Sequence, residues 1–112
     1  NHASTDVRAE SMRALGLIGH PTAIPAISHG LVDNAWEVRA QAAIAAGRIR
    51  LPRLISALAE LLEDSEWWVR FRAAEAIGKM GDEGAQTLLD RSLGDGEGAQ
   101  IARLALAELG DD

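Results

Sequence analysis

A pattern of valine, arginine and glycine recurs along the chain at a fixed step of 31 residues. The valines are Val7, Val38 and Val69, and an arginine follows each of them directly. A glycine stands nine residues after each valine, and a weaker fourth copy runs from Ile101 to Gly110. A fixed period of about 20 to 50 residues is the signature of stacked structural repeats. We therefore expect one elongated array of similar units.

Each copy has the periodicity of a helix. At 100° per residue, Val7, Leu15 and Ile18 fall on one side of the first helix, and charged residues fall on the other side. Alanine and leucine dominate, and only 4% of residues are aromatic, which also favours helix. We predict an all-α fold of seven helices, one unpaired helix followed by three antiparallel pairs, over residues 5–19, 21–32, 36–49, 52–63, 67–80, 83–93 and 99–109.

These repeated residues resemble the HEAT-repeat family, in particular the short HEAT-like repeats of the phycobilisome lyase type. The resemblance is carried by Asp33 with Val38 and Arg39, Asp64 with Val69 and Arg70, the alanine pairs Ala42/Ala43 and Ala73/Ala74, and the glycines Gly47, Gly78 and Gly110. It implies a right-handed α-solenoid that forms a single domain over residues 1–112.

The resemblance also implies that the turn aspartates and the arginines six residues later, Arg39 and Arg70, form a ladder between neighbouring repeats. We therefore expect these arginines to be structural. The last copy departs from the pattern, because Ala102 stands at the arginine position. The final rung of the ladder is expected to be altered.

The first helix lacks a preceding partner. Residues 1–4 show no pattern, and nothing before them could cover Val7, Met12 and Leu15. A repeat cannot cover its own apolar face. We therefore expect residues 1–112 to be a fragment of a longer protein, with a dimer through this bare end as the alternative.

Composition narrows the class of protein. The net charge of −6 argues against a nucleic-acid partner, because nucleic acids usually bind to a basic face of a protein. No apolar run approaches the roughly 20 residues of a membrane span, so no membrane contact is expected. A cytoplasmic location fits these features best.

Catalytic patterns are lacking. The chain has no cysteine, and its three histidines do not have the spacing of metal ligands. No phosphate-binding glycine loop or nucleophile motif occurs. We expect no enzyme activity, no metal and no cofactor. The resemblance offers one enzyme-class alternative, an accessory or regulatory subunit of a bilin lyase.

The repeat itself separates structural residues from candidate binding residues. Trp36 and Trp67 occupy equivalent positions, so both are predicted to pack between repeats. Trp68 stands where the other copies carry acidic residues, and Phe71 stands where they carry alanine. Both aromatic residues are predicted to lie on the exposed part of their helix, where they could anchor a partner.

We predict a protein-interaction or scaffold module. The resemblance implies that the valine helices line a concave face on which partners bind, and the partner would offer an acidic or apolar segment. A purely structural spacer is a further alternative. The predicted binding residues are Trp68, Phe71, Arg72, Glu75 and Lys79, extended by Gln41, Ile44 and Arg48 of the preceding repeat, and more weakly by Arg13 and Leu17.

Overall fold

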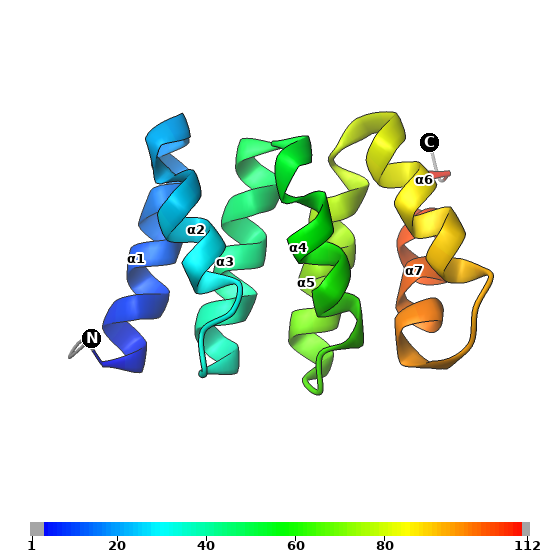
Figure 1. Ribbon diagram of the computed structural model, residues 1–112, viewed down its shortest axis with the longest axis horizontal. Helices are drawn as coiled ribbons and strands as arrows, with labels where there is room; N and C mark the ends of the chain where they lie inside the picture. The colour runs from blue at the N-terminus through cyan, green and yellow to red at the C-terminus, as the bar shows by residue number, and fades with distance from the viewer. Residues whose placement is uncertain (1–3, 111–112) are drawn as a thin grey trace.

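A computed structural model describes residues 4–110, which form seven α-helices and no strand (Figure 1). The α-helices are α1 (Thr5–Ile18), α2 (Ile24–Gly30), α3 (Trp36–Ile49), α4 (Ile55–Glu60), α5 (Trp67–Gly78), α6 (Gly81–Ser92) and α7 (Gly96–Leu109). The predicted all-α solenoid-like fold is confirmed.

Proline shapes the starts of α2 and α4. Short 3-10 turns, Pro21–Ala23 and Pro52–Leu54, precede α2 and α4. Proline suits the first turn of a helix, because it has no N–H to leave unpaired there and its φ is already helical. A third 3-10 turn, Leu61–Glu63, follows α4.

The last two helices begin earlier than predicted. α6 begins at Gly81 and α7 at Gly96, because these glycines supply the turns into the helices, with φ of 70° and 91°. Gly98 lies inside α7, where a Cβ would collide with the Glu63 side chain. Gly96 and Gly98, which the prediction placed between two helices, therefore serve a turn and a close contact at the start of α7.

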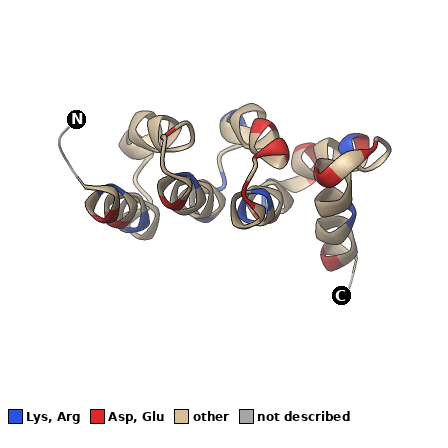
Figure 2. Cartoon of the chain, turned by 90° about the horizontal axis from the view of Figure 1, so that it is seen from below, with Lys and Arg blue, Asp and Glu red and all other residues tan. Residues whose placement is uncertain are grey.

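The helices form two layers. α1, α3 and α5 lie side by side in one layer, and α2, α4 and α6 lie in the other (Figure 2). The largest fully buried side chains come from both layers, so the core lies between them. They are Ile27, Leu31, Val38, Leu58, Leu62, Val69, Ile77 and Leu88.

Small residues allow the valine helices to pack closely. A Cβ on Gly16 would lie only 2.7 Å from the Cα of Ala45, and one on Gly47 would lie 3.0 Å from the Cα of Ala76. The glycine of each helix therefore meets an alanine backbone of the next helix. This contact repeats from α1 to α3 and from α3 to α5.

The bare end of α1 differs in part from the prediction. Val7 is 55% exposed and Leu15 is half-buried, but Met12 is buried. The Met12 sulfur lies against Gly30 of α2, and Ala42 of α3 lies beside the same glycine. The prediction for Met12 was wrong, because this residue belongs to the side of α1 that faces the following helices.

α7 does not continue the layer of valine helices. In Figure 2, α1, α3 and α5 are seen end-on, whereas α7 is seen from its side and extends away from both layers. The step into the fourth copy is 32 residues, from Val69 to Ile101, instead of 31. The fourth copy has therefore lost the register of the first three, and α7 packs mainly against α6 and α5.

Candidate functional site

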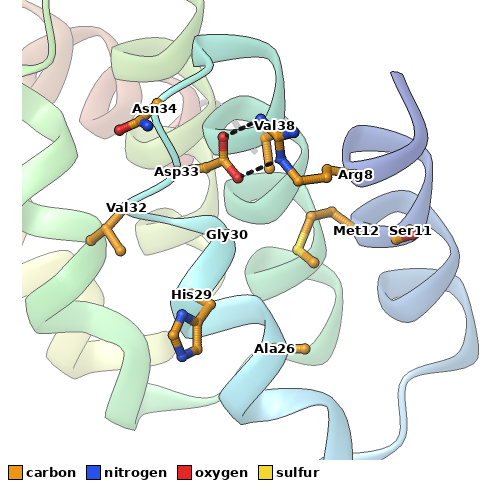
Figure 3. A pocket seen from close by; sticks show the side chains of 10 residues that line it. All are labelled: Arg8, Ser11, Met12, Ala26, His29, Gly30, Val32, Asp33, Asn34 and Val38. Atoms are coloured by element: carbon orange, nitrogen blue, oxygen red, sulfur yellow. Dashed lines mark hydrogen bonds and ion pairs between the residues drawn. The ribbon is translucent and has the colours of Figure 1, made fainter. Parts of the chain in front are cut away.

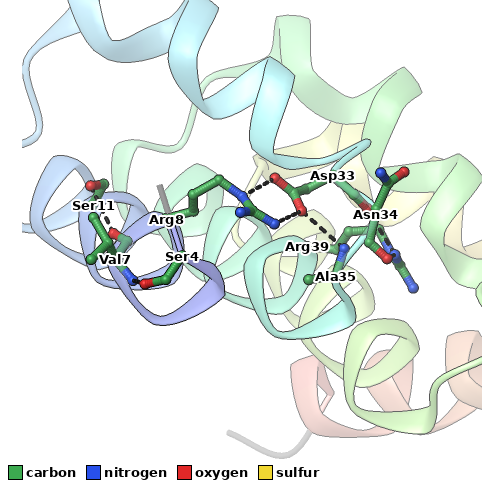
Figure 4. A network of polar contacts seen from close by, with 8 residues as sticks. All are labelled: Ser4, Val7, Arg8, Ser11, Asp33, Asn34, Ala35 and Arg39. Atoms are coloured by element: carbon green, nitrogen blue, oxygen red, sulfur yellow. Dashed lines mark hydrogen bonds and ion pairs between the residues drawn. The ribbon is translucent and has the colours of Figure 1, made fainter. Parts of the chain in front are cut away.

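Arginine–aspartate pairs connect successive repeats, and Figure 4 shows the first of them, Arg8 with Asp33. The Arg39 guanidinium donates to the Asp64 carboxylate at 2.8 and 3.1 Å and to the carbonyls of Asp33 and Asn34 at 2.8 and 3.0 Å. Arg8 makes the same bidentate contact with Asp33, at 2.9 and 3.0 Å. Each arginine thus reaches the turn of the following repeat, and the predicted ladder is confirmed for these two rungs.

The third rung is weaker. Arg70 is buried and donates to the Asp64 carbonyl at 2.8 Å, as Arg39 does in its own turn. Its carboxylate partner is Glu97, at 3.4 Å, and the Glu97 side chain is 71% exposed. The change in the fourth copy therefore already affects the arginine of the third copy.

The Arg8–Asp33 pair favours the charged form of the Asp33 carboxylate. The hydrogen bond from Arg8 lowers the pKa of Asp33 below its ordinary value, and the backbone N–H of Ala35 adds to this effect at 2.9 Å. Partial burial acts in the opposite direction but is the smaller influence. Asp33 is therefore a structural anion that organises the turn before α3.

A groove of about 280 Å³ lies between α5 and α7. One wall is a stripe on α5, formed by Trp67, Phe71, Ala74 and Gly78. The other wall comes from α7, and its apolar members are Ile101, Leu104, Ala105 and Leu109. Glu75, Lys79 and Glu108 also line the groove, so an apolar floor carries charged groups on its rim.

The same stripe on α3 is filled by a helix. Its equivalent residues are Trp36, Ala40, Ala43 and Gly47, and Ala40 is only 7% exposed. There, α5 packs directly onto the small side chains. On α5 the stripe carries the bulky Phe71 in place of alanine, and at Gly78 the nearest α7 side chain is Leu109, 3.6 Å from a Cβ built on that glycine. A groove therefore remains where a close helix contact would otherwise form.

Two aromatic residues lie differently from the prediction. Trp67, predicted to pack between repeats, is 46% exposed, whereas Trp36 is half-buried against the core. Phe71, predicted to be exposed, is half-buried and stacks on Trp67 with ring centroids 5.1 Å apart. Both predictions were wrong. Trp67 is exposed because it faces α7, which has turned away, and Phe71 is half-buried because it stacks on Trp67 and packs against the core.

Trp68 and Arg72 form a second contact on α5. Trp68 is 50% exposed, as predicted, and its ring meets those of Trp67 and Phe71 edge to face. The Arg72 guanidinium lies 5.5 Å from the Trp68 ring centroid and 5.3 Å from that of Phe71. Arg72 also pairs with Glu75 at 3.1 Å. These contacts pre-organise long side chains that would otherwise be mobile.

The remaining predicted binding residues lie at the neighbouring positions. Lys79 is exposed at the end of α5, and its Cδ lies 3.6 Å from a Cβ built on Gly47 of α3. Arg48 is exposed on the last turn of α3, and Gln41 and Ile44 of α3 are half-buried. Gly47 and Arg48 are adjacent in α3, so Lys79 of α5 lies close to the α3 backbone next to Arg48.

Sequence reasoning missed the α7 wall of the groove. Ile101, Leu104 and Leu109 belong to the copy with the weakest match to the repeat, so no equivalent residues marked them. One signal was available. Both earlier copies carry alanine at the position of Phe71. A small residue that recurs at one position of a repeat indicates close packing, so the larger Phe71 indicated that the packing changes there.

A second, larger concavity of about 660 Å³ lies between α1 and α2 (Figure 3). Arg8 and Asp33 contribute its charged groups, and they bind each other. Met12 and Val38 contribute apolar surface, and His29 lies at its edge. Its charged groups thus already serve the ladder.

Within residues 4–110, metal-binding groups and membrane-spanning helices are both absent. No group of three or more histidine, aspartate and glutamate side chains there could hold a metal ion. None of the helices in that range is long and apolar enough to cross a membrane.

Comparison with protein families agrees with this geometry. The model that describes HEAT repeats matches residues 1–66 and again residues 33–110. The two matches overlap by about one repeat and together span all seven helices. A search of curated proteins gave no match. The matched model is the general one, so the lyase-type subgroup stays a prediction. The chain belongs to the HEAT-repeat family.

Proposed function

We propose that this chain is a protein-interaction module that binds its partner through α5 and the groove beside it. The observation that supports this most strongly is the distribution of aromatic residues. The chain has four, and Trp67, Trp68 and Phe71 are all within five consecutive positions of α5. Both tryptophans there are about half exposed. Neighbouring exposed apolar side chains of this size are typical of an interaction surface.

The composition of this surface suits protein recognition. Tryptophan and arginine are enriched among the residues that dominate binding energy. Trp68 and Arg72 already contact each other, so little side-chain entropy would be lost when a partner binds. The apolar groove would take one or two apolar side chains of the partner, while Gln41, Ile44 and Arg48 would extend the contact across α3.

Affinity purification with a matched control tests this proposal. The bait proteins are the wild type, a Trp68→Ala/Phe71→Ala double variant, and Glu37→Ala, which changes the α3 position equivalent to Trp68. Removing two aromatic anchors should weaken partner binding by about 100-fold or more. The partner should therefore be retained by the wild type and Glu37→Ala but lost with the double variant.

Melting curves of the three baits show whether each is folded. Partners identified in this way should then be purified and their affinities measured by calorimetry. If a folded double variant retains the same proteins with the same affinities as the wild type, α5 does not provide the binding surface and the proposal fails.

A further inference from the structure

Four basic side chains of this acidic chain form no ion pair with its carboxylates in the described residues. Seven of the ten arginines donate to a carboxylate or a carbonyl: Arg8, Arg13, Arg39, Arg70, Arg72, Arg91 and Arg103. The others, Arg48, Arg50 and Arg53, and the single lysine, Lys79, are exposed and make no ion pair or side-chain hydrogen bond within residues 4–110. Because the chain has 17 acidic residues against 11 basic ones, basic side chains without a carboxylate partner are unexpected.

The four cations lie at one edge of the molecule. α3 and α5 both end at the upper edge in Figure 1. Arg48 lies in the last turn of α3, Arg50 caps that helix, and Arg53 lies in the 3-10 turn that follows. Lys79 caps α5 and lies next to Gly47, the neighbour of Arg48. We refer to these four residues as the basic edge.

Arg50 has an unusual backbone. Its φ and ψ are 59° and 50°, in the left-handed region, and no other non-glycine residue within residues 4–110 has a positive φ. Gly19 and Gly81 stand one repeat step before and after it, with φ of 71° and 70°. The repeat thus uses glycine at this helix end twice. An arginine there adopts a conformation that a Cβ disfavours, and such strain is retained where it has a use.

Helix ends explain only part of the basic edge. The partial negative charge at a helix C-terminus favours Arg48 and Lys79 at their positions without any ligand. It does not explain why Arg50 replaces glycine, or why Arg53, in the next turn, also lacks a partner.

We infer that the basic edge binds an acidic segment of the protein partner. Arginine side chains bind carboxylates through paired hydrogen bonds, and exposed arginines that have no internal partner are free to do so. Arg48 and Lys79 also border the α5 surface, so one partner could contact both regions. The inference rests on the proposed function only in taking the partner to be a protein. The chain's net charge of −6 makes a nucleic acid a poorer match.

Binding of a fluorescein-labelled oligoglutamate peptide, followed by anisotropy at low salt, tests this inference. The wild type should bind it, and Arg50→Gly should weaken binding about fivefold. The same substitution should raise the melting temperature by about 4 °C, because glycine relieves the strain. Arg50→Lys should keep most of the affinity. Arg91→Gln removes the same charge from α6, outside the basic edge and the predicted binding residues, and is the matched control.

Each outcome supports or overturns the inference. Absence of peptide binding to the wild type overturns it, as does an affinity loss in Arg50→Gly no larger than that in Arg91→Gln. A single-stranded oligonucleotide that binds the basic edge more tightly than the peptide also overturns it. A wild type that does not bind the peptide but captures its partner through α5 would overturn this inference alone. A wild type that binds the peptide through the basic edge, with partner capture unchanged in the Trp68→Ala/Phe71→Ala variant, would overturn the proposed function alone.

Discussion

The surface between α3 and α5 and the surface between α5 and α7 start from equivalent stripes and end differently. On α3 the stripe carries small residues, and Gly47 touches the backbone of Ala76. On α5 it carries Phe71 beside Trp67, and a groove lies between the stripe and α7, with Leu109 at ordinary contact distance from Gly78. The size of a few side chains therefore decides whether the next helix stacks or leaves a groove.

The ladder shows the same contrast. Asp64 accepts a bidentate contact from Arg39 and has a mostly buried side chain, whereas Glu97 meets Arg70 at 3.4 Å and is largely exposed. Ion pairs between exposed groups contribute little to stability, while losing one partner of a sheltered pair costs much more. The regular part of the array is thus held by sheltered ion pairs and close packing together, whereas the carboxylate that joins the last unit to Arg70 is exposed.

The largest expected effect comes from removing the sheltered carboxylate. Asp64→Ala should lower the free energy of unfolding by about 3 kcal/mol, because it leaves the Arg39 guanidinium and the Glu66 N–H without their acceptor. Glu97→Ala should cost less than about 0.5 kcal/mol. Urea unfolding of both variants measures the difference. Equal losses would show that the two rungs are equivalent after all.

The next effect tests packing. Gly16→Ala should lower the free energy of unfolding by about 2 kcal/mol, because the new Cβ would meet the Ala45 backbone and force α1 away from α3. Gly78→Ala places its Cβ at ordinary contact distance from the Leu109 side chain. Helix propensity should then raise stability by up to about 0.5 kcal/mol. Thermal melts should therefore shift in opposite directions, and destabilisation by both would contradict the contrast between tight and loose contacts.

The smallest effect concerns pH at the regular end of the ladder. Because the pKa of Asp33 is lowered in the folded state, its contribution is complete above the unfolded pKa of about 4 and is lost as the pH falls through the folded pKa. Asp33→Asn should be less stable than wild type at pH 7, and the gap should narrow from pH 5 towards pH 2. A gap that stays constant over this range would mean that Asp33 acts without its charge.

Much of the fold could be predicted from the sequence, because the repeat acts as its own control. The recurring valines, arginines and glycines predicted the seven helices in their correct order and two rungs of the ladder, although α6 and α7 begin earlier than predicted. The predicted exposure of Phe71 was wrong, because helical periodicity tells which side of a helix a residue occupies but not which neighbour lies opposite. That neighbour, α7, enters the array after a step of 32 residues, so the register from earlier copies no longer applied.

The candidate binding surface was predictable in part. Trp68 stands out because it replaces acidic residues on an exposed face, and it is exposed in the structure. The groove depends on how α7 turns, which follows from packing between distant residues. The left-handed backbone of Arg50 was not predicted, although Gly19 and Gly81 stand one repeat step before and after it in the sequence.

The ladder also has a kinetic consequence. Its first two rungs join residues only 25 positions apart, as Arg8 joins Asp33 and Arg39 joins Asp64. Chains whose contacts are local in sequence fold quickly, and repeat arrays tend to open from their ends. α3 contacts a valine helix on each side and carries a rung of its own. Its amide protons should therefore exchange with solvent most slowly in the chain, with α3 as the last element to unfold.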